Sequence, residues 1–284
     1  MHTNFKGEKP FFIMVPVILW QMLFFYLPLI VIAVVSILKF SSLGVYQGVT
    51  TENYTHFLSP TYVFIILKSL ALALTNGMLC FLIGYPLAYF VSFKAGKLKN
   101  FFLFLLILPF WTNFLLHIYA WFFVLDKGGL LNTVLLRLGL IYEPLQFLNS
   151  LMAIMLLMVY SYLPFMVLPI YSILERFDRK LLEASADLGA TSWHTWTRIT
   201  LPLSISGVIS GFALVFVPSF GEFAIPGLMG GEKYVFVGSV ISQYVLANRT
   251  ISLGAAFTVI SSCALILFVG ILYLIVRRII REKR

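Results

Sequence analysis

Six long apolar stretches decide what this chain can fold into. They cover residues 11–38, 69–93, 101–125, 151–174, 203–225 and 253–276. A bilayer core about 30 Å thick is crossed by roughly 20 apolar residues in a helix, so each stretch is long enough to span a membrane. Hydrogen bonds within a helix also satisfy the backbone polar groups that lipid cannot. The sequence therefore predicts an all-α integral membrane protein with six transmembrane helices, in a single domain over residues 1–284.

The composition supports this prediction. Of the 284 residues, 61% are hydrophobic and only 11% are charged, whereas soluble domains carry about 25% charged residues. So few charges would not cover the surfaces of the two soluble domains that the length alone suggests. The net charge of +9 is therefore interpreted as a signal of membrane orientation rather than of nucleic-acid binding.

The basic residues are divided unequally between the two sides of the predicted membrane. Both termini, the loop at 94–99 and the segment at 176–201 share one side and hold 14 of the 20 Lys and Arg residues. Because Lys and Arg collect in cytoplasmic loops, we expect both termini to lie in the cytoplasm.

Motifs of catalysis are absent from the sequence. There is no phosphate-binding G-x-x-x-x-G-K-[ST], no H-E-x-x-H, no G-x-S-x-G and no metal-ligand spacing of His, Cys and carboxylates. Cys80 and Cys263 lie in apolar stretches and are predicted to be small core residues. His117 lies in the third stretch, where a polar contact between helices is a simpler interpretation than a proton relay. The sequence thus predicts no enzyme, cofactor or metal.

The segment at 175–201 is longer than a connection between helices needs. A small apolar face recurs there at helical spacing, formed by Leu181, Leu182, Ala184, Ser185 and Leu188. Gly189 fits a left-handed helix cap. Ser192 is the expected N-cap of a second short helix, which Pro202 ends at the start of the fifth span. The small face favours docking to a protein groove, with an interfacial membrane anchor as the alternative.

These residues resemble the EAA loop of bacterial ABC-importer permeases. That loop has the pattern E-A-A, three residues, G, nine residues, I-x-L-P, which here corresponds to Glu183, Ala184, Ser185, Gly189, Ile199, Leu201 and Pro202. Only the second alanine is replaced, by Ser185. Segments at 107–113, 117–121, 163–171 and 221–226 are similar to the spermidine/putrescine permeases, a branch of the binding-protein-dependent transport system inner-membrane components.

The resemblance implies the type I ABC importer permease fold, with residues 175–201 as a two-helix cytoplasmic coupling loop. It implies polyamine transport by ATP-driven alternating access across the bacterial cytoplasmic (inner) membrane. The implied partners are a cytoplasmic ABC ATPase dimer, a second permease in a heterodimer, an extracytoplasmic polyamine-binding protein and membrane lipid, with no nucleic acid. The implied ATPase-coupling residues are Glu183, Ala184, Asp187, Gly189, Leu201 and Pro202.

Glu222 is the only formally charged residue in the six apolar stretches. A charge at membrane depth costs about 2.5 kcal/mol or more and marks a functional site by default, although solvation near the surface or pairing with another subunit is the alternative. Pro218 and Gly221 interrupt the helix beside it. Carboxylates and aromatic faces bind ammonium groups, and Trp121 and Tyr162 supply further faces. The predicted substrate pathway comprises Glu222, Trp111, Asn113, Tyr119 and Tyr160.

Other functions fit parts of the pattern. A stand-alone secondary transporter would have inverted repeats and several membrane-embedded charges, and a membrane scaffold would also fit the long loop. Within the ABC permeases, another small organic cation or an amino acid remains an alternative substrate. Gly207 and Gly211 form a G-x-x-x-G pattern, which predicts close helix packing.

Overall fold

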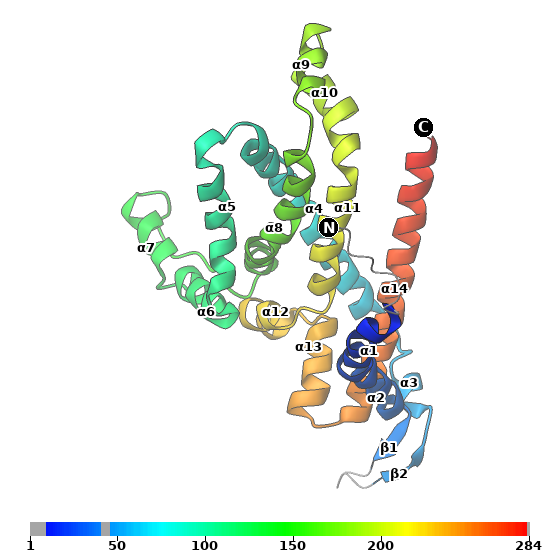
Figure 1. Ribbon diagram of the computed structural model, residues 1–284. Coiled ribbons are helices and arrows are strands. Elements are labelled where there is room, and N and C mark those ends of the chain that lie inside the picture. The colour runs from blue at the N-terminus through cyan, green and yellow to red at the C-terminus, as the bar shows by residue number, and fades with distance from the viewer. Residues whose placement is uncertain (1–9, 41–45, 283–284) are drawn as a thin grey trace. The chain divides into compact units, whose positions relative to one another are not determined.

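The computed structural model describes residues 10–40 and 46–282, and this part of the chain is mainly helical (Figure 1). It divides into two compact units. The first comprises the residues up to Val63 together with those from Val240 onward, and the second comprises Phe64–Ser239. Within the described residues, the predicted all-α fold is confirmed except for one short β-hairpin.

The first unit contains the N-terminal helices, the hairpin and the C-terminal helix. Its elements are α1 (Pro10–Gln21), a π-helical turn (Met22–Tyr26), α2 (Leu27–Ser36), β1 (Leu38–Phe40), β2 (Tyr46–Val49), α3 (Glu52–His56), a second π-helical turn (Gln243–Ala247) and α14 (Ile251–Glu282). The strands pair antiparallel, with Leu38 opposite Val49. The Asn53 amide joins them to the end of α2 by donating to the carbonyls of Ser36 (2.9 Å) and Leu38 (3.1 Å). Helix α14 packs along α2.

The second unit is a helical bundle. Its elements are α4 (Pro60–Phe93), a 3-10 turn (Gly96–Leu98), α5 (Lys99–Ile107), a 3-10 turn (Leu108–Trp111), α6 (Phe114–Leu125), α7 (Leu130–Arg137), α8 (Leu151–Glu175), α9 (Lys180–Asp187), α10 (Ser192–Thr195), a π-helical turn (Trp196–Thr200), α11 (Leu201–Phe220), α12 (Ala224–Met229), a 3-10 turn (Gly231–Lys233) and α13 (Val237–Ser242). Helices α4 and α13 begin and end, respectively, in the first unit.

Helices α8 and α11 pack against each other at two glycines of α11. A Cβ atom on Gly207 would lie 2.8 Å from the Pro169 carbonyl oxygen, and one on Gly211 would lie 2.9 Å from the Met166 carbonyl oxygen. No larger side chain fits at either position without moving a backbone. The predicted close packing at the G-x-x-x-G pattern is confirmed.

Two buried polar pairs join α4 to α11 in the second unit. The Tyr85 and Ser204 hydroxyls are 2.9 Å apart, and the Asn76 amide donates to the Ser219 hydroxyl oxygen at 2.8 Å. Because a buried polar group costs free energy unless it is hydrogen-bonded, these pairs fix the register of the two helices.

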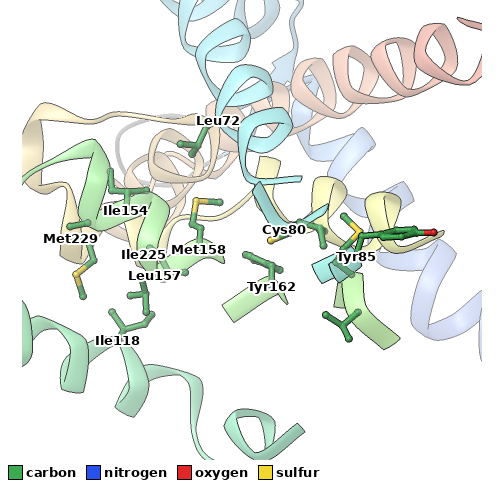
Figure 2. Close-up of a cluster of buried hydrophobic side chains, with 14 of the residues drawn as sticks. Leu72, Cys80, Tyr85, Ile118, Ile154, Leu157, Met158, Tyr162, Ile225 and Met229 are labelled. Atoms are coloured by element: carbon green, nitrogen blue, oxygen red, sulfur yellow. The ribbon is translucent and has the colours of Figure 1, made fainter. Parts of the chain in front are cut away.

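The core of the second unit lies among α4, α6, α8 and α12 (Figure 2). Buried side chains from these helices include Leu72, Cys80, Tyr85, Ile118, Ile154, Leu157, Met158, Tyr162, Ile225 and Met229. Cys80 is thus a core residue, as predicted. The same prediction for Cys263 is wrong, because Cys263 is exposed on α14. In a membrane protein an apolar stretch also meets lipid, so apolar surroundings in sequence do not imply burial.

Six helices in the described part of the chain are long and apolar enough to cross a membrane, which confirms the predicted number. They are Met14–Ser36, Pro60–Phe93, Phe114–Arg137, Leu151–Glu175, Ser192–Phe220 and Ile251–Leu274. The apolar stretch at 101–125 is not one continuous helix. A 3-10 turn at Leu108–Trp111 separates α5 from α6, and Thr112 is extended (φ −106°, ψ 159°). Pro109 lies in this turn, where it removes one backbone N–H donor and fixes its own φ.

Candidate functional site

The start of the coupling loop, at the C-terminal end of α8, is held by contacts with α4 and α5. Lys99 pairs with the Glu175 carboxylate at the end of α8, and the Arg179 guanidinium donates to the Ser92 carbonyl at 3.4 Å. Hydrogen bonding to Glu175 raises the pKa of Lys99, which keeps the ammonium charged. The loop therefore leaves α8 at a point tied to the end of α4 and the start of α5.

Helix α9 ends in a Schellman motif. Gly189 has a φ of +74°, and its N–H donates to the Ala186 carbonyl at 2.8 Å. The next N–H, of Ala190, donates to the Ser185 carbonyl at 3.1 Å. These are the two bonds of a Schellman cap around a left-handed residue. The predicted left-handed cap at Gly189 is confirmed.

The second helix of the loop differs from the prediction in its N-cap. The Thr191 hydroxyl, rather than that of Ser192, accepts the cap bond, from the His194 N–H at 3.3 Å. Thr191 is the residue with extended backbone (φ −68°, ψ 155°), and Ser192 already has helical geometry. A cap requires non-helical backbone, so the predicted N-cap is wrong by one residue.

The predicted end of this helix before Pro202 is also wrong. Helix α10 continues through the π-helical turn Trp196–Thr200 into α11. The Leu201 N–H donates to the Trp196 carbonyl, five residues back. Pro202 has no N–H to donate, and the wider π turn directly before it lets the chain stay helical. The second arm of the loop is thus a direct extension of a membrane helix.

The two arms of the loop are joined by a hydroxyl pair. Ser185 is buried, and its Oγ lies 2.8 Å from Thr195 Oγ1. The rest of the α9 face stays open: Leu188 is 88% exposed and Leu181 is exposed as well. Trp193 is 69% exposed and packs against the Trp196 ring at 4.9 Å. An exposed leucine and tryptophan therefore flank a turn that internal bonds hold in shape.

The six predicted coupling residues occupy two places. Glu183, Ala184, Asp187 and Gly189 are exposed on α9 and its cap. Leu201 is half-buried and Pro202 is exposed, both in the first turn of α11. The first four lie together on the free surface of the loop, whereas the last two lie where the loop joins the membrane helix.

Glu222 lies in the bend between α11 and α12 (residues 221–223). The Tyr162 hydroxyl donates to Oε2 at 2.7 Å, and the N–H groups of Ala224 and Ile225 donate to Oε1 at 3.0 and 3.4 Å. Three hydrogen-bond donors therefore converge on this one carboxylate. The bend is closely packed, since a Cβ atom on Gly238 would lie 2.3 Å from the Gly221 carbonyl oxygen.

The break between α5 and α6 carries two of the predicted pathway residues, and α6 itself carries a third. Trp111 is 72% exposed, with its ring 5.5 Å from that of Phe104. Asn113 caps α6, because its Oδ1 accepts the Leu115 N–H at 2.9 Å. Tyr119 is exposed one turn into α6. Asn113 is thus engaged as the N-cap of α6, whereas the Trp111 and Tyr119 side chains are exposed.

Tyr160, the remaining predicted pathway residue, lies beside a small cavity. This cavity, of about 100 Å³, is lined by Pro109, Thr112, Phe114, His117, Tyr160 and Ser161, and we call it the His117 pocket. The Tyr160 hydroxyl lies 3.1 Å from His117 Nδ1, and Thr112 forms a hydrogen bond with His117 Nε2. Thr112 and Ser161 were not predicted from the sequence. Their only sequence signal is a hydroxyl close to the Pro109 break or to Tyr160.

The structure does not gather the predicted pathway residues into one site. Among the described residues, no hydrogen bond or ring contact joins Glu222 to Trp111, Asn113, Tyr119 or Tyr160. Tyr160 and Tyr162 are two residues apart on α8, so their side chains leave the helix about 200° apart. Glu222 therefore lies on one side of α8 with Tyr162, and the His117 pocket lies on the other.

Comparisons with known proteins agree with this architecture. Residues 81–281 match the family model of the binding-protein-dependent transport system inner membrane component. The spermidine/putrescine transport system permease protein PotB of Haemophilus influenzae is 37% identical over 255 residues, covering 89% of each chain. The protein of the same name from Escherichia coli K12 is 39% identical over 262 residues, covering 92% of this chain and 94% of its own. A crystal structure of a bacterial alginate ABC transporter, in complex with an alginate pentasaccharide-bound periplasmic protein, contains a similarly folded chain. Its TM-score is 0.75 at 18% identity, over 95% of this chain and 94% of that one.

Proposed function

This chain belongs to the family of binding-protein-dependent transport system inner membrane components, and we propose that it is the permease subunit of an ABC importer for polyamines. The subunit moves spermidine or putrescine across the bacterial inner membrane by ATP-driven alternating access. Near full-length similarity to two spermidine/putrescine permeases supports the substrate class. The whole chain, residues 1–284, acts as one permease domain.

The observation that carries the transport mechanism is the coupling loop. Its shape is fixed internally by the Gly189 cap and the pair of Ser185 with Thr195, yet Leu188 and Trp193 stay exposed. Apolar side chains presented on a preorganised turn suit a partner groove. That partner is a cytoplasmic ABC ATPase dimer, which Glu183 and Asp187 contact through their exposed carboxylates. ATP is hydrolysed on the ATPase.

Force from the ATPase reaches the membrane through α11. The second arm of the loop continues into α11 without a break, and α11 is packed against α8 at Gly207 and Gly211. A rigid helix moves as a unit, so displacement of the loop shifts α11 and the bend that carries Glu222. Leu201 and Pro202 lie at the joint and transmit this motion.

Glu222 supplies the negative charge in the substrate pathway. Within the described part of the chain, Oε2 accepts one hydrogen bond, from Tyr162, so it keeps a lone pair for an ammonium group. Trp111 and Tyr119 present exposed aromatic faces, which hold cations at about 0.5–2 kcal/mol each, and Asn113 and Tyr160 add polar contacts. The proposed contacts for the cation therefore lie on both sides of α8.

The complete importer contains further subunits. A second permease forms a heterodimer with this chain, and an extracytoplasmic binding protein delivers the polyamine. The solved alginate transporter bound to its periplasmic protein supports this arrangement by analogy of fold. The side that holds 14 of the 20 basic residues faces the cytoplasm, so both termini are cytoplasmic. A reporter fused to each terminus tests this orientation.

Reconstitution tests the proposal. The chain is co-purified with its ATPase and second permease, placed in liposomes with the binding protein, and assayed for ATP hydrolysis. Spermidine or putrescine should stimulate hydrolysis, whereas an amino acid or alginate oligosaccharide should not. Stimulation by an amino acid alone would overturn the polyamine assignment, and failure to retain any ATPase would overturn the coupling loop's role.

A further inference from the structure

We propose that the His117 pocket is a binding subsite for one primary ammonium group, separate from Glu222. The pocket lies where Pro109 breaks the helix, and its lining includes Thr112, His117, Tyr160 and Ser161. Non-helical backbone at membrane depth is tolerated where it is buried or lines a polar cavity. Only the identity of the amine, a polyamine, rests on the proposed function.

Hydrogen bonds in the pocket run in one direction. The Thr112 hydroxyl donates to the Pro109 carbonyl at 3.1 Å, so its oxygen accepts the proton of His117 Nε2. His117 Nδ1 lies 3.1 Å from the Tyr160 hydroxyl oxygen. In the neutral imidazole with its proton on Nε2, Nδ1 is an acceptor and takes the Tyr160 hydroxyl proton. In this tautomer the pocket carries no charge that would repel a cation.

This order of bonds leaves oxygen acceptors for a ligand. In this tautomer the Tyr160 hydroxyl donates its proton to His117, so its oxygen lone pairs are free to accept a hydrogen bond from a ligand. The Ser161 hydroxyl has no hydrogen-bond partner within the described residues. Phe114 and Tyr160, both in the lining, supply aromatic rings. Two hydroxyl oxygens and aromatic faces match an ammonium group, which has only donors.

The volume of the pocket limits how much of a ligand it can hold. A volume of about 100 Å³ holds roughly three water molecules at about 30 Å³ each, or one ammonium group with its first methylenes. None of the described residues that line the pocket is a carboxylate, so binding is weak enough for the amine to leave again, as a transport path requires.

Thiol labelling tests the pocket directly. Ser161→Cys is made in a Cys263→Ser background, since Cys263 is exposed and Cys80 is buried. The purified transporter in detergent is treated with 2-aminoethyl methanethiosulfonate, which is cationic, and with neutral methyl methanethiosulfonate. Ser210→Cys, exposed on α11, gives the reference ratio of the two rates. We expect the cationic preference at position 161 to exceed that reference by about tenfold.

Second variants separate binding from mere accessibility. Adding Tyr160→Phe to Ser161→Cys should reduce the preference toward the reference ratio, whereas Tyr142→Phe, on an almost fully exposed side chain, should leave it unchanged. Spermidine should slow the labelling of position 161. Equal ratios at positions 161 and 210, or no labelling at 161 by either reagent, would overturn the subsite. A preserved cationic preference without protection by spermidine would support the subsite and overturn the polyamine as its ligand.

Discussion

The coupling loop and the Glu222 bend are both interruptions between helices, but they satisfy their polar groups in different ways. In the bend, Tyr162 and two backbone N–H groups donate to the carboxylate of Glu222, and Gly238 packs directly against the backbone. In the loop, internal bonds fix only the turn, and Leu188 and Trp193 remain exposed. The contacts of the bend are therefore made within this chain, whereas the loop presents exposed apolar side chains, which we propose contact another protein.

This difference predicts how each region responds to substitution. Changes in the bend should lower the stability of the isolated chain, because its contacts are intramolecular. Changes on the exposed face of the loop should leave the isolated chain intact and act only in the assembled transporter.

The largest effect is expected at Gly238. In Gly238→Ala, the new Cβ would lie 2.3 Å from the Gly221 carbonyl oxygen and 2.7 Å from that of Glu222. Backbone must move to relieve such overlap, at a cost of more than about 3 kcal/mol. Thermal unfolding of the purified protein in detergent measures the loss. Gly227→Ala is the matched control, since a Cβ there meets nothing within 4 Å, and an equal loss in both variants would contradict the close packing of the bend.

The next effect separates the charge of Glu222 from its structural bonds. Glu222→Gln keeps the size of the side chain and one acceptor oxygen for the N–H groups of Ala224 and Ile225. We expect a drop in polyamine uptake of about tenfold or more, as the loss of a charged hydrogen bond costs about 1.5–3 kcal/mol. The unfolding midpoint should change far less than in Gly238→Ala.

The control for Glu222 is another carboxylate of the second unit. Glu232→Gln removes an exposed charge a short distance along the chain and should leave uptake unchanged. Wild-type uptake kinetics in Glu222→Gln would remove the residue from the substrate pathway and leave it as a purely structural cap.

A smaller effect is expected at Glu183, which is exposed in the coupling loop. Glu183→Ala truncates an exposed side chain, so the unfolding midpoint should stay within about 0.5 kcal/mol of the wild type. Retention of the ATPase in a pull-down should weaken by about five- to thirtyfold, the equivalent of about 1–2 kcal/mol, and uptake should fall with it. Glu143→Ala, also exposed, controls for the loss of charge. Unchanged pull-down together with full uptake would refute the role of Glu183.

The sequence predicts the membrane spans and the helix packing of this molecule better than the details of its sites. The six spans follow from apolar length, and the C-terminal cap of α9 at Gly189 and the close approach at Gly207 and Gly211 follow from the positions of glycines. These features depend on local chemistry, so they are visible in one chain segment at a time. The N-cap at Thr191 was missed because the sequence does not locate a helix start to within one residue. The continuous helix through Pro202 was missed because a π turn cannot be recognised from residue composition.

The lack of direct contact between Glu222 and the other predicted pathway residues has a different reason. Residue types that suit a cation were chosen from several helices, but a sequence does not state which faces meet. Tyr160 and Tyr162, only two residues apart, lie on nearly opposite sides of α8, and the hydrogen bonds of His117 with Thr112 and Tyr160 depend on the extended backbone after Pro109. Tertiary geometry of this kind requires the structure.

The smallest effect tests whether the loop holds its shape without a partner. Ser185→Ala restores the second alanine of the EAA pattern and removes the 2.8 Å contact with Thr195. Thr195 keeps its bond to the Thr191 carbonyl at 3.2 Å, so the cost should be below about 1 kcal/mol. A double-mutant cycle with Thr195→Val, followed by hydrogen exchange of the loop amides, gives the coupling energy. Uptake should remain near wild type, because the Gly189 cap alone still turns the chain. If Ser185→Ala instead abolished ATPase retention while Gly189→Ala did not, the hydroxyl pair rather than the left-handed cap would set the shape that the ATPase binds.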